Sequence, residues 1–344
     1  MSILRFDGVS KSFSGKQVLD RLSFSVERAQ VYGLLGPNGC GKSTAINILC
    51  NLLDPDAGTV RIDDMASRDA KRILGYCPQE TALYRDLNAV ENLRFFAQVY
   101  GLSHARGELR VEELVELFGL GPHARTPMGS LSGGWQRRVS IAVALVHEPE
   151  VVVLDEPTSA VDLEARHELW QLIERLRDGG TTILLTTHHL DEAERLCSRI
   201  GIMRDGRIVH EGSIPELLAL VPGEMVAVLD TREEDAVRRK AVQLGWGIRH
   251  YAGKIACLLP RETTLKSVVD NFSGIDLSAV NLKKVSLEHA FLEVVSEGNH
   301  CSGSDLHPCS DGRSMPVNRN DGRSIPDTRS LPSNPRPRSN SSSA

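Results

Sequence analysis

Short apolar runs and amphipathic stretches alternate along about the first 220 residues of the chain. The apolar runs are rich in residues that favour strands, and the stretches between them carry apolar residues at helical spacing. This order is typical of an α/β fold, in which helices pack on a sheet. Strands are predicted at residues 3–9, 22–26, 31–35, 59–62, 151–154 and 182–185.

The pattern becomes helical between about residues 88 and 129, so a helical insertion over about residues 88–147 is expected to divide the α/β core. A second unit follows, in which segments read strand, helix, strand, strand, helix, strand, helix. That order predicts a small two-layer α+β domain at residues 223–298, after an α/β domain at residues 1–222. Its segments are predicted at residues 225–229, 233–244, 247–251, 255–259, 265–272, 280–283 and 287–295.

Composition changes sharply at residues 299–344, which contain no aromatic residue, no Lys and no Glu, and are crowded with Ser, Pro, Arg and Asn. Such a segment cannot bury enough apolar surface to offset its ordering entropy, so a disordered tail is predicted. Within it an Arg-Ser-x-Pro repeat begins at Arg313, Arg323 and Arg329, and is interpreted as low-complexity sequence, with a docking or phosphorylation motif as the alternative. A zinc site is not favoured there, because no apolar positions surround the candidate ligands His300, Cys301, His307 and Cys309.

Net charge, hydropathy and cysteine content exclude several classes of protein. A formal charge of −5 and a pI near 6.1 argue against a broadly basic nucleic-acid-binding surface. No apolar run approaches the roughly 18 residues that a spanning helix needs, and the first nine residues lack an export signal. The seven cysteines do not indicate a disulfide framework, since five of them are scattered through periodic segments as expected of buried thiols in a reducing cytosol.

The segment GPNGCGKS at residues 36–43 fits the phosphate-binding pattern GxxxxGK[ST] in full, and lies between a predicted strand and a predicted helix at residues 43–52. Its glycines let backbone N–H groups surround phosphates, and the helix N-terminus adds a favourable dipole. Lys42 is expected to reach the β- and γ-phosphates, and the Ser43 hydroxyl to coordinate Mg²⁺.

An apolar run at residues 151–154 is followed by two carboxylates, Asp155 and Glu156. The carboxyl ends of strands are where open α/β sheets bind ligands. Asp155 is therefore predicted to hold Mg²⁺ through water, and Glu156 to act as the general base on the water that attacks the γ-phosphate.

A Ser-Gly-Gly turn at Ser132, Gly133 and Gly134 precedes a predicted helix at residues 137–146 and forms a second candidate anion site. One chain thus has two phosphate-seeking surfaces but one phosphate loop. A symmetric dimer, in which the Ser132 turn of each chain closes over the nucleotide of the other, accounts for both.

The order of these motifs resembles the ATP-binding subunits of ATP-binding cassette (ABC) proteins over about residues 3–220. The resemblance implies a P-loop NTPase cassette with a β-rich start, a RecA-like core and a helical insertion, followed by a small α+β accessory domain. Further marks of the family are Phe13 for adenine stacking, Gln79 after Pro78, the loop at residues 159–162 that ends in Asp162, and the switch histidine His188. Taken singly, Phe13 could be a core aromatic, Gln79 an ordinary loop residue and His188 a strand cap.

The resemblance implies binding of ATP and Mg²⁺ by specific residues of this chain. Catalytic roles are expected for Lys42, Gln79, Glu156 and His188, and Mg²⁺ ligation for Ser43, Gln79 and Asp155. Nucleotide binding is expected for Phe13, Gly36, Pro37, Asn38, Gly39, Cys40, Gly41, Lys42, Ser43, Thr44, Ser132, Gly133, Gly134 and Asp162.

Trp135, Val161 and Cys40 stand out within these motifs. Trp135 and Val161 depart from the usual family residues, although neither change removes a catalytic atom. Cys40 lies in the phosphate loop near a helix N-terminus, where a thiol pKa can fall. Alkylation of Cys40 is expected to block ATP binding.

The second unit points to one branch of the family. The segment SLEHAFLE at residues 286–293 and the segment TTHHLDEAE at residues 186–194 resemble ATPase subunits of bacterial drug, polysaccharide and haem-type exporters. An exporter subunit at the cytoplasmic face of the cell membrane is therefore implied, with a separate multi-spanning permease that docks near residues 88–100. ATP binding would close the dimer and hydrolysis would release it.

Two alternatives are weighed against this hypothesis. A soluble ABC ATPase acting on ribosomes or DNA is disfavoured by the single cassette and by the absence of a heptad array, and no nucleic-acid partner is expected. A non-hydrolysing regulatory subunit is disfavoured because Lys42, Asp155, Glu156 and His188 are all present.

Overall fold

The computed structural model describes residues 1–251 and 253–296, and these residues belong to one compact unit. The tail predicted at residues 299–344, with its Arg-Ser-x-Pro repeat and the disfavoured zinc ligands, lies outside the described residues. Five cysteines of the described part are free thiols, as expected.

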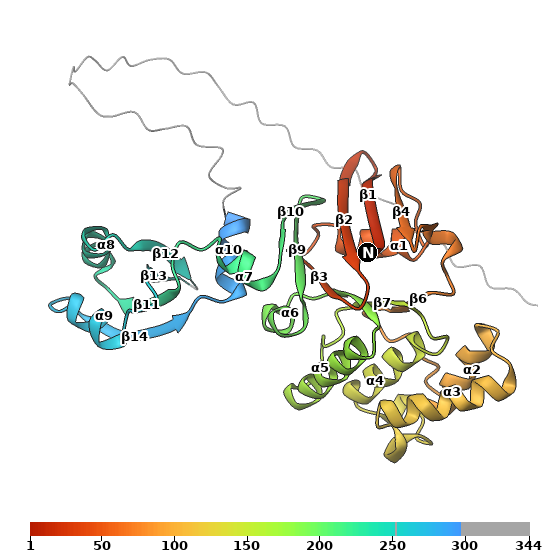
Figure 1. Cartoon of the computed structure of the whole chain (residues 1–344). Helices are drawn as coiled ribbons and strands as arrows, with labels where there is room; N and C mark the ends of the chain where they lie inside the picture. The colour runs from red at the N-terminus through yellow and green to blue at the C-terminus, as the bar shows by residue number, and fades with distance from the viewer. Residues whose placement is uncertain (252, 297–344) are drawn as a thin grey trace, which may run out of the picture. The chain divides into compact units, whose positions relative to one another are not determined.

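An antiparallel sheet opens the chain, in the order β2-β1-β4-β5 (Figure 1). Strands β1 and β2 alternate buried and exposed side chains, because one face of each covers the core and the other meets solvent. Three of its strands were predicted, though β1 and β2 extend further than the apolar runs. Its strands are β1 (Ser2–Phe13), β2 (Lys16–Glu27), β4 (Ala57–Ile62) and β5 (Met65–Ala66).

The central sheet is mostly parallel, in the order β10-β9-β3-β8-β7-β6. Strands β3, β7 and β8 are buried on both faces along their whole length, as expected of central parallel strands. Because they run parallel, their carboxyl ends meet at one edge. The strands are β3 (Val31–Leu35), β6 (Leu74–Cys77), β7 (Val151–Asp155), β8 (Thr182–Thr186), β9 (Arg199–Arg204) and β10 (Arg207–Gly212), the last antiparallel to β9.

Helices cover this sheet and form the insertion (Figure 1). Between β6 and β7 lie α2 (Ala89–Val99), α3 (His104–Leu117) and α4 (Gly133–Ala144), with no strand among residues 88–147, so the helical insertion is confirmed. Asn88 and Glu91 close a capping box at the start of α2. The other helices of the region are α1 (Lys42–Leu49), α5 (Leu163–Asp178), α6 (Leu190–Leu196) and α7 (Ile214–Leu218), and 3₁₀ turns span Ser67–Asp69, Gly121–His123 and Met128–Ser130.

Two predicted helix boundaries were wrong. Helix α4 begins at Gly133 rather than at residue 137, because Ser132 is its N-cap and the Gly-Gly pair already forms its first turn. Helix α1 ends at Leu49 rather than at residue 52, since Asn51 takes a left-handed conformation with φ of 55°.

The third sheet has the order β12-β13-β11-β14 and is antiparallel. Helices α8 and α9 share a core with one face of it. Helix α10 joins the main core, to which Val226, Ala256 and Leu258 of the other face also belong. All seven predicted segments are confirmed, with ends shifted by at most a few residues. They are β11 (Met225–Thr231), α8 (Glu234–Gln243), β12 (Gly247–Tyr251), β13 (Lys254–Leu259), α9 (Leu265–Asn271), β14 (Leu277–Lys284) and α10 (Leu287–Ser296).

In residues 1–251 and 253–296, no helix has both the length and the apolar composition needed to span a bilayer.

Candidate active site

A cavity of about 520 Å³ lies where the carboxyl ends of β3, β7 and β8 meet. Residues that were far apart in the sequence converge there, because all of them except Val18, which lies on β2, come at or after the end of one of these parallel strands or of the neighbouring β6. Its lining contains Val18, Asn38, Gly39, Gly41, Lys42, Ser43, Thr44, Gln79, Asp155, Glu156, Ser159 and His188.

The phosphate loop joins β3 to α1 and is held in a curled conformation by its glycines. Gly39 and Gly41 adopt φ values of 79° and 111°, which a side chain disfavours. At Gly36 a Cβ atom would lie 2.3 Å from the Met203 carbonyl oxygen, so only glycine fits. The buried Lys42 ammonium donates hydrogen bonds to the carbonyl oxygens of Gly36 (2.7 Å) and of Pro37 (3.3 Å), which places the cation inside the loop.

Asp155 and Glu156 end β7 in different environments. Asp155 is 8% exposed, accepts a hydrogen bond from the Thr186 hydroxyl at 2.5 Å, and has a pKa raised chiefly by burial. Glu156 has a φ of 47°, rare for a residue with a side chain, and its N–H donates to the Thr186 carbonyl at 3.0 Å. The turn aims the Glu156 carboxylate into the cavity, where its Oε2 lies 2.9 Å from His188 Nδ1.

Gln79 completes this cluster. Its Nε2 lies 3.4 Å from Glu156 Oε2, so the glutamine and the switch histidine both face one carboxylate oxygen. A carboxylate oriented by two polar neighbours is suited to accept a proton from a water in the cavity.

The oxygen donors at the cavity fit Mg²⁺, which prefers hydroxyl, amide and carboxylate oxygens together with water. Ser43, Gln79 and Asp155 all line the cavity and would supply those oxygens. The raised pKa of Asp155 supports the fit, since a divalent cation would offset the cost of a buried carboxylate.

The Ser132 turn and Asp162 do not line this cavity. The turn lies against the start of α5, the helix that Asp162 precedes, because a Cβ atom on Gly134 would fall 2.8 Å from Ala165 Cβ. Asp162 caps α5 by accepting the Ala165 N–H at 2.9 Å. The Ser132 hydroxyl makes no capping bond to α4, which leaves the N-terminus of that helix without a side-chain acceptor.

Phe13 also lies outside the cavity lining, at the end of β1. It is 45% exposed, with the Lys11 ammonium 5.7 Å from its ring centroid. An exposed ring of this kind is available for stacking, whereas the alternative of a core aromatic was wrong.

Cys40 lies in the phosphate loop, where its thiol is buried. Burial raises the pKa of its thiol, and the residue is only 6% exposed, so desolvation outweighs the loop's cationic surroundings. The pKa of this thiol is thus raised, whereas a position near a helix N-terminus can lower it.

We expect Cys40 to react with iodoacetamide several-fold more slowly in the folded chain than in guanidinium, because little of it is thiolate or accessible. Mass spectrometry of the peptide over time measures this. Equal rates in both conditions would contradict the expectation. Forced labelling should still block ATP binding, since the Cys40 sulfur lies 2.6 Å from where a Cβ of Gly36 would stand.

Sequence reasoning missed Arg137, which lies beneath the cavity on α4. It is 4% exposed, and its guanidinium donates to the carbonyl oxygens of Asp155 (2.6 Å), Pro157 (2.9 Å), Gln79 (3.2 Å) and Pro78. One side chain thus ties the Gln79 loop to the end of β7. The sequence signal that could have revealed this residue is a single arginine within an otherwise apolar helical face.

We expect Arg137→Met to lower the free energy of unfolding by about 3 kcal/mol, because it leaves several buried carbonyls without a donor. Hydrolysis should also fall by about tenfold or more, since Gln79 and Asp155 lose their common support. Denaturant unfolding and ATPase rates measure both. Arg106→Met, which removes an exposed ion pair with Glu148, is the control and should cost less than about 1 kcal/mol. Equal losses in the two variants would contradict this role.

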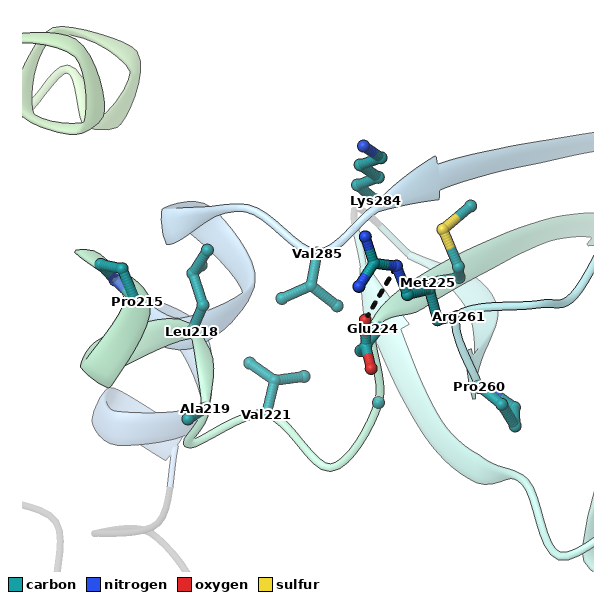
Figure 2. A pocket seen from close by; sticks show the side chains of 11 residues that line it. Pro215, Leu218, Ala219, Val221, Glu224, Met225, Pro260, Arg261, Lys284 and Val285 are labelled. Carbon is teal, nitrogen blue, oxygen red and sulfur yellow. Dashed lines mark ion pairs between the residues drawn. The ribbon is translucent and has the colours of Figure 1, made fainter.

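A larger cavity of about 700 Å³ shares no residue with this site (Figure 2). Its walls are mostly apolar, and Val221 and Val285 face each other in it. Its charged rim contains an ion pair between Glu224 and Arg261 at 3.7 Å. Since it lacks a phosphate loop and a cluster of carboxylates, the smaller cavity is the candidate active site.

Known proteins share this combination of fold and motifs. A family model described as ABC transporter matches residues 19–159. A Nod factor export ATP-binding protein I of Ralstonia nicotianae is 41% identical over 301 residues, which is 85% of this chain and 93% of that protein. The daunorubicin resistance ATP-binding protein DrrA3 of Streptomyces coeruleorubidus is 35% identical over 308 residues, 85% of this chain and 95% of that protein.

Solved structures agree with the sequence matches. A dimeric ATP-binding cassette in a post-hydrolysis state, bound to ADP and Pi, is similar to this chain with a TM-score of 0.56 and 28% identity, over 61% of this chain and 98% of that one. Its bound products are those of ATP hydrolysis. The chain therefore belongs to the ABC transporter family, as an ATP-binding protein and an ATPase with the P-loop NTPase fold.

Proposed function

We propose that this chain is the ATP-hydrolysing subunit of an exporter, that it dimerises around two ATP molecules, and that it drives a separate membrane subunit. The cluster of Glu156, His188 and Gln79 beside the phosphate loop is the observation that carries the proposal.

Each residue then has a role set by its position. Lys42 and the loop glycines bind the β- and γ-phosphates, and Phe13 stacks on adenine. Glu156 accepts a proton from the attacking water, while Gln79 and His188 orient that water and the γ-phosphate. Bound Mg²⁺, held by Ser43, Gln79 and Asp155, would neutralise charge on the phosphates.

The second chain supplies the Ser132 turn. Ser132, Gly133 and Gly134 lie outside the cavity of their own chain, and the free N-terminus of α4 suits the γ-phosphate of a nucleotide bound to the partner. Asp162, which caps α5 beside this turn, would lie at the same interface. ATP thus closes the dimer, and loss of the γ-phosphate releases it.

The membrane partner docks on α2 in this proposal. Tyr84, Phe95 and Val99 are 50%, 37% and 63% exposed, and the rings of Tyr84 and Phe95 are 4.7 Å apart. An apolar patch of this kind near the Gln79 loop is suited to a protein partner. Relatives named for daunorubicin resistance and Nod factor export support an exporter at the cytoplasmic face of the membrane, with a cassette at residues 1–222 and an accessory domain at residues 223–298.

A tagged pull-down from detergent-solubilised native membranes, with ATP present, tests the partner. We expect a multi-spanning protein to co-purify in stoichiometric amount, and Phe95→Glu to abolish its recovery. Leu109→Glu on α3, equally apolar and 54% exposed in the parent, is the control. Charge reversal at Glu91, which also lies on α2, would not test docking cleanly, because the Glu91 side chain closes the capping box of that helix. Ribosomes, DNA or no membrane partner would favour the soluble ATPase instead.

A further inference from the structure

Helix α10 follows the third sheet in the chain and packs against both that sheet and the cassette. On the side of the sheet, Arg249 of β12 pairs with Glu293 at 2.6 Å, and the rings of Tyr251 and His289 are in contact, with their centroids 4.9 Å apart. Leu287, Ala290 and Val294 are at most 4% exposed and recur at helical spacing, so they form one buried face. This face belongs to the main core and α10 contacts α6, α7 and β9. Val285, at the wall of the larger cavity, leads directly into α10 (Figure 2).

The start of α10 is bound to the element that carries the switch histidine. The Leu287 N–H donates to Glu194 Oε2 at 3.1 Å. Glu194 lies on α6, whose N-cap is His189, next to His188. The carboxylate thus satisfies one of the backbone donors that a helix N-terminus leaves open, and it fixes α6 against α10.

The end of α10 is bound to the element behind the phosphate loop. The Arg204 guanidinium donates to the carbonyl oxygens of Val294 (2.8 Å) and Val295 (3.3 Å). Arg204 ends β9, and in the turn that follows, the Gly206 N–H donates to the Cys40 carbonyl at 3.1 Å. A cation at the C-terminus of α10 is thereby connected to the loop that binds phosphate.

We infer that α10 couples the third sheet to ATP hydrolysis, by positioning the switch histidine through Glu194 and the phosphate loop through Arg204. The inference rests on the proposed roles of His188 and of the loop at residues 36–43. The two contacts join α10 to segments that lead to two parts of the same cavity lining, His188 and the phosphate loop, so a shift of α10 moves both parts together. Glu194 and Arg204 are positioning residues, since neither lines the cavity.

Steady-state ATPase kinetics of the full-length chain test each contact separately. Glu194→Ala is expected to lower kcat by about fivefold to tenfold with KM for ATP unchanged, because the switch histidine acts on the bound nucleotide. Arg204→Ala is expected to raise KM by about fivefold to tenfold, because the phosphate loop loses its support. Glu194→Gln keeps an oxygen that accepts the Leu287 N–H and should restore kcat to within about twofold of the parent.

Glu112→Ala and Arg238→Ala, on exposed positions of α3 and α8, are the controls. Equal kinetics in Glu194→Ala, Arg204→Ala and the controls would overturn the inference, as would a loss in Glu194→Ala that Glu194→Gln does not restore. Glu156→Gln is measured in parallel. If Glu156→Gln hydrolyses ATP normally, the proposed residue roles are wrong. If it loses activity while Glu194→Ala and Arg204→Ala keep normal kinetics, only the coupling inference is wrong.

Hydrogen exchange gives a second test, whose main measurement is made on the parent chain. Coupling is reciprocal, so a non-hydrolysable ATP analogue with Mg²⁺ should slow exchange of the Leu287 amide by about fivefold. The change should be absent in Glu194→Ala. Exchange at Leu287 that does not respond to the analogue would overturn the inference.

Discussion

Glu156→Gln is expected to lower ATP hydrolysis by about 10²- to 10³-fold while ATP binding stays near its parent level. Glutamine has almost the same shape, and its oxygen can still face His188 Nδ1, which lies 2.9 Å from the carboxylate. It cannot accept a proton from water at neutral pH. Only the chemical step should therefore suffer, with the phosphate loop unchanged.

Single-turnover hydrolysis and equilibrium binding of labelled ATP separate these two effects. Since ATP persists in this variant, the proposed dimer should also be stabilised, which sedimentation with and without ATP detects. Glu262→Gln, at an exposed position outside the cavity, is the control. A decrease of less than about tenfold in the hydrolysis rate would assign the general base elsewhere.

The sequence was a good guide to this site because its chemistry depends on backbone turns with strict residue requirements. Glycine is required at Gly36, where the Met203 carbonyl approaches closely, and at Gly39 and Gly41, where φ is positive. Such requirements produce a spacing of glycines that can be recognised in the sequence. The predicted strands at residues 31–35, 151–154 and 182–185 are fully buried in the central sheet, so continuous apolar runs mark them clearly.

Elements that depend on tertiary context were missed. Strand β6 is four residues long and interrupted by Gly75, which is needed because a Cβ there would lie 2.1 Å from the Ala144 carbonyl. Strands β9 and β10 carry arginines at their ends and form a hairpin, whose turn donates the Gly206 N–H to the Cys40 carbonyl in the phosphate loop. Arg137 and Arg204 donate to backbone carbonyls that lie far from them in sequence, so no local pattern could predict these contacts.

Asp155→Asn is expected to abolish Mg²⁺-dependent hydrolysis and, in the nucleotide-free chain, to raise the melting temperature. In the proposed role the Asp155 carboxylate holds the cation, so its loss should lower the rate by about 10²-fold or more. The stability effect has the opposite sign, because burial raises the pKa of Asp155 above its usual value of 3.8. The folded chain then binds the proton more tightly than the unfolded chain, so ionisation of Asp155 costs stability as pH rises between the two pKa values.

The gain of Asp155→Asn should therefore be small below the ordinary pKa of an aspartate, should grow as pH rises from that value to the raised pKa of the folded state, and should then stay constant. The asparagine oxygen can still accept the Thr186 hydroxyl, so the local geometry is kept. Calorimetry from acid to neutral pH, without nucleotide or divalent cation, measures the difference, with Asp270→Asn at an exposed position as the control. A variant less stable than its parent at neutral pH would show that Asp155 is retained for folding. The expected result shows instead that this carboxylate is kept for the cation, at a cost to the stability of the empty site.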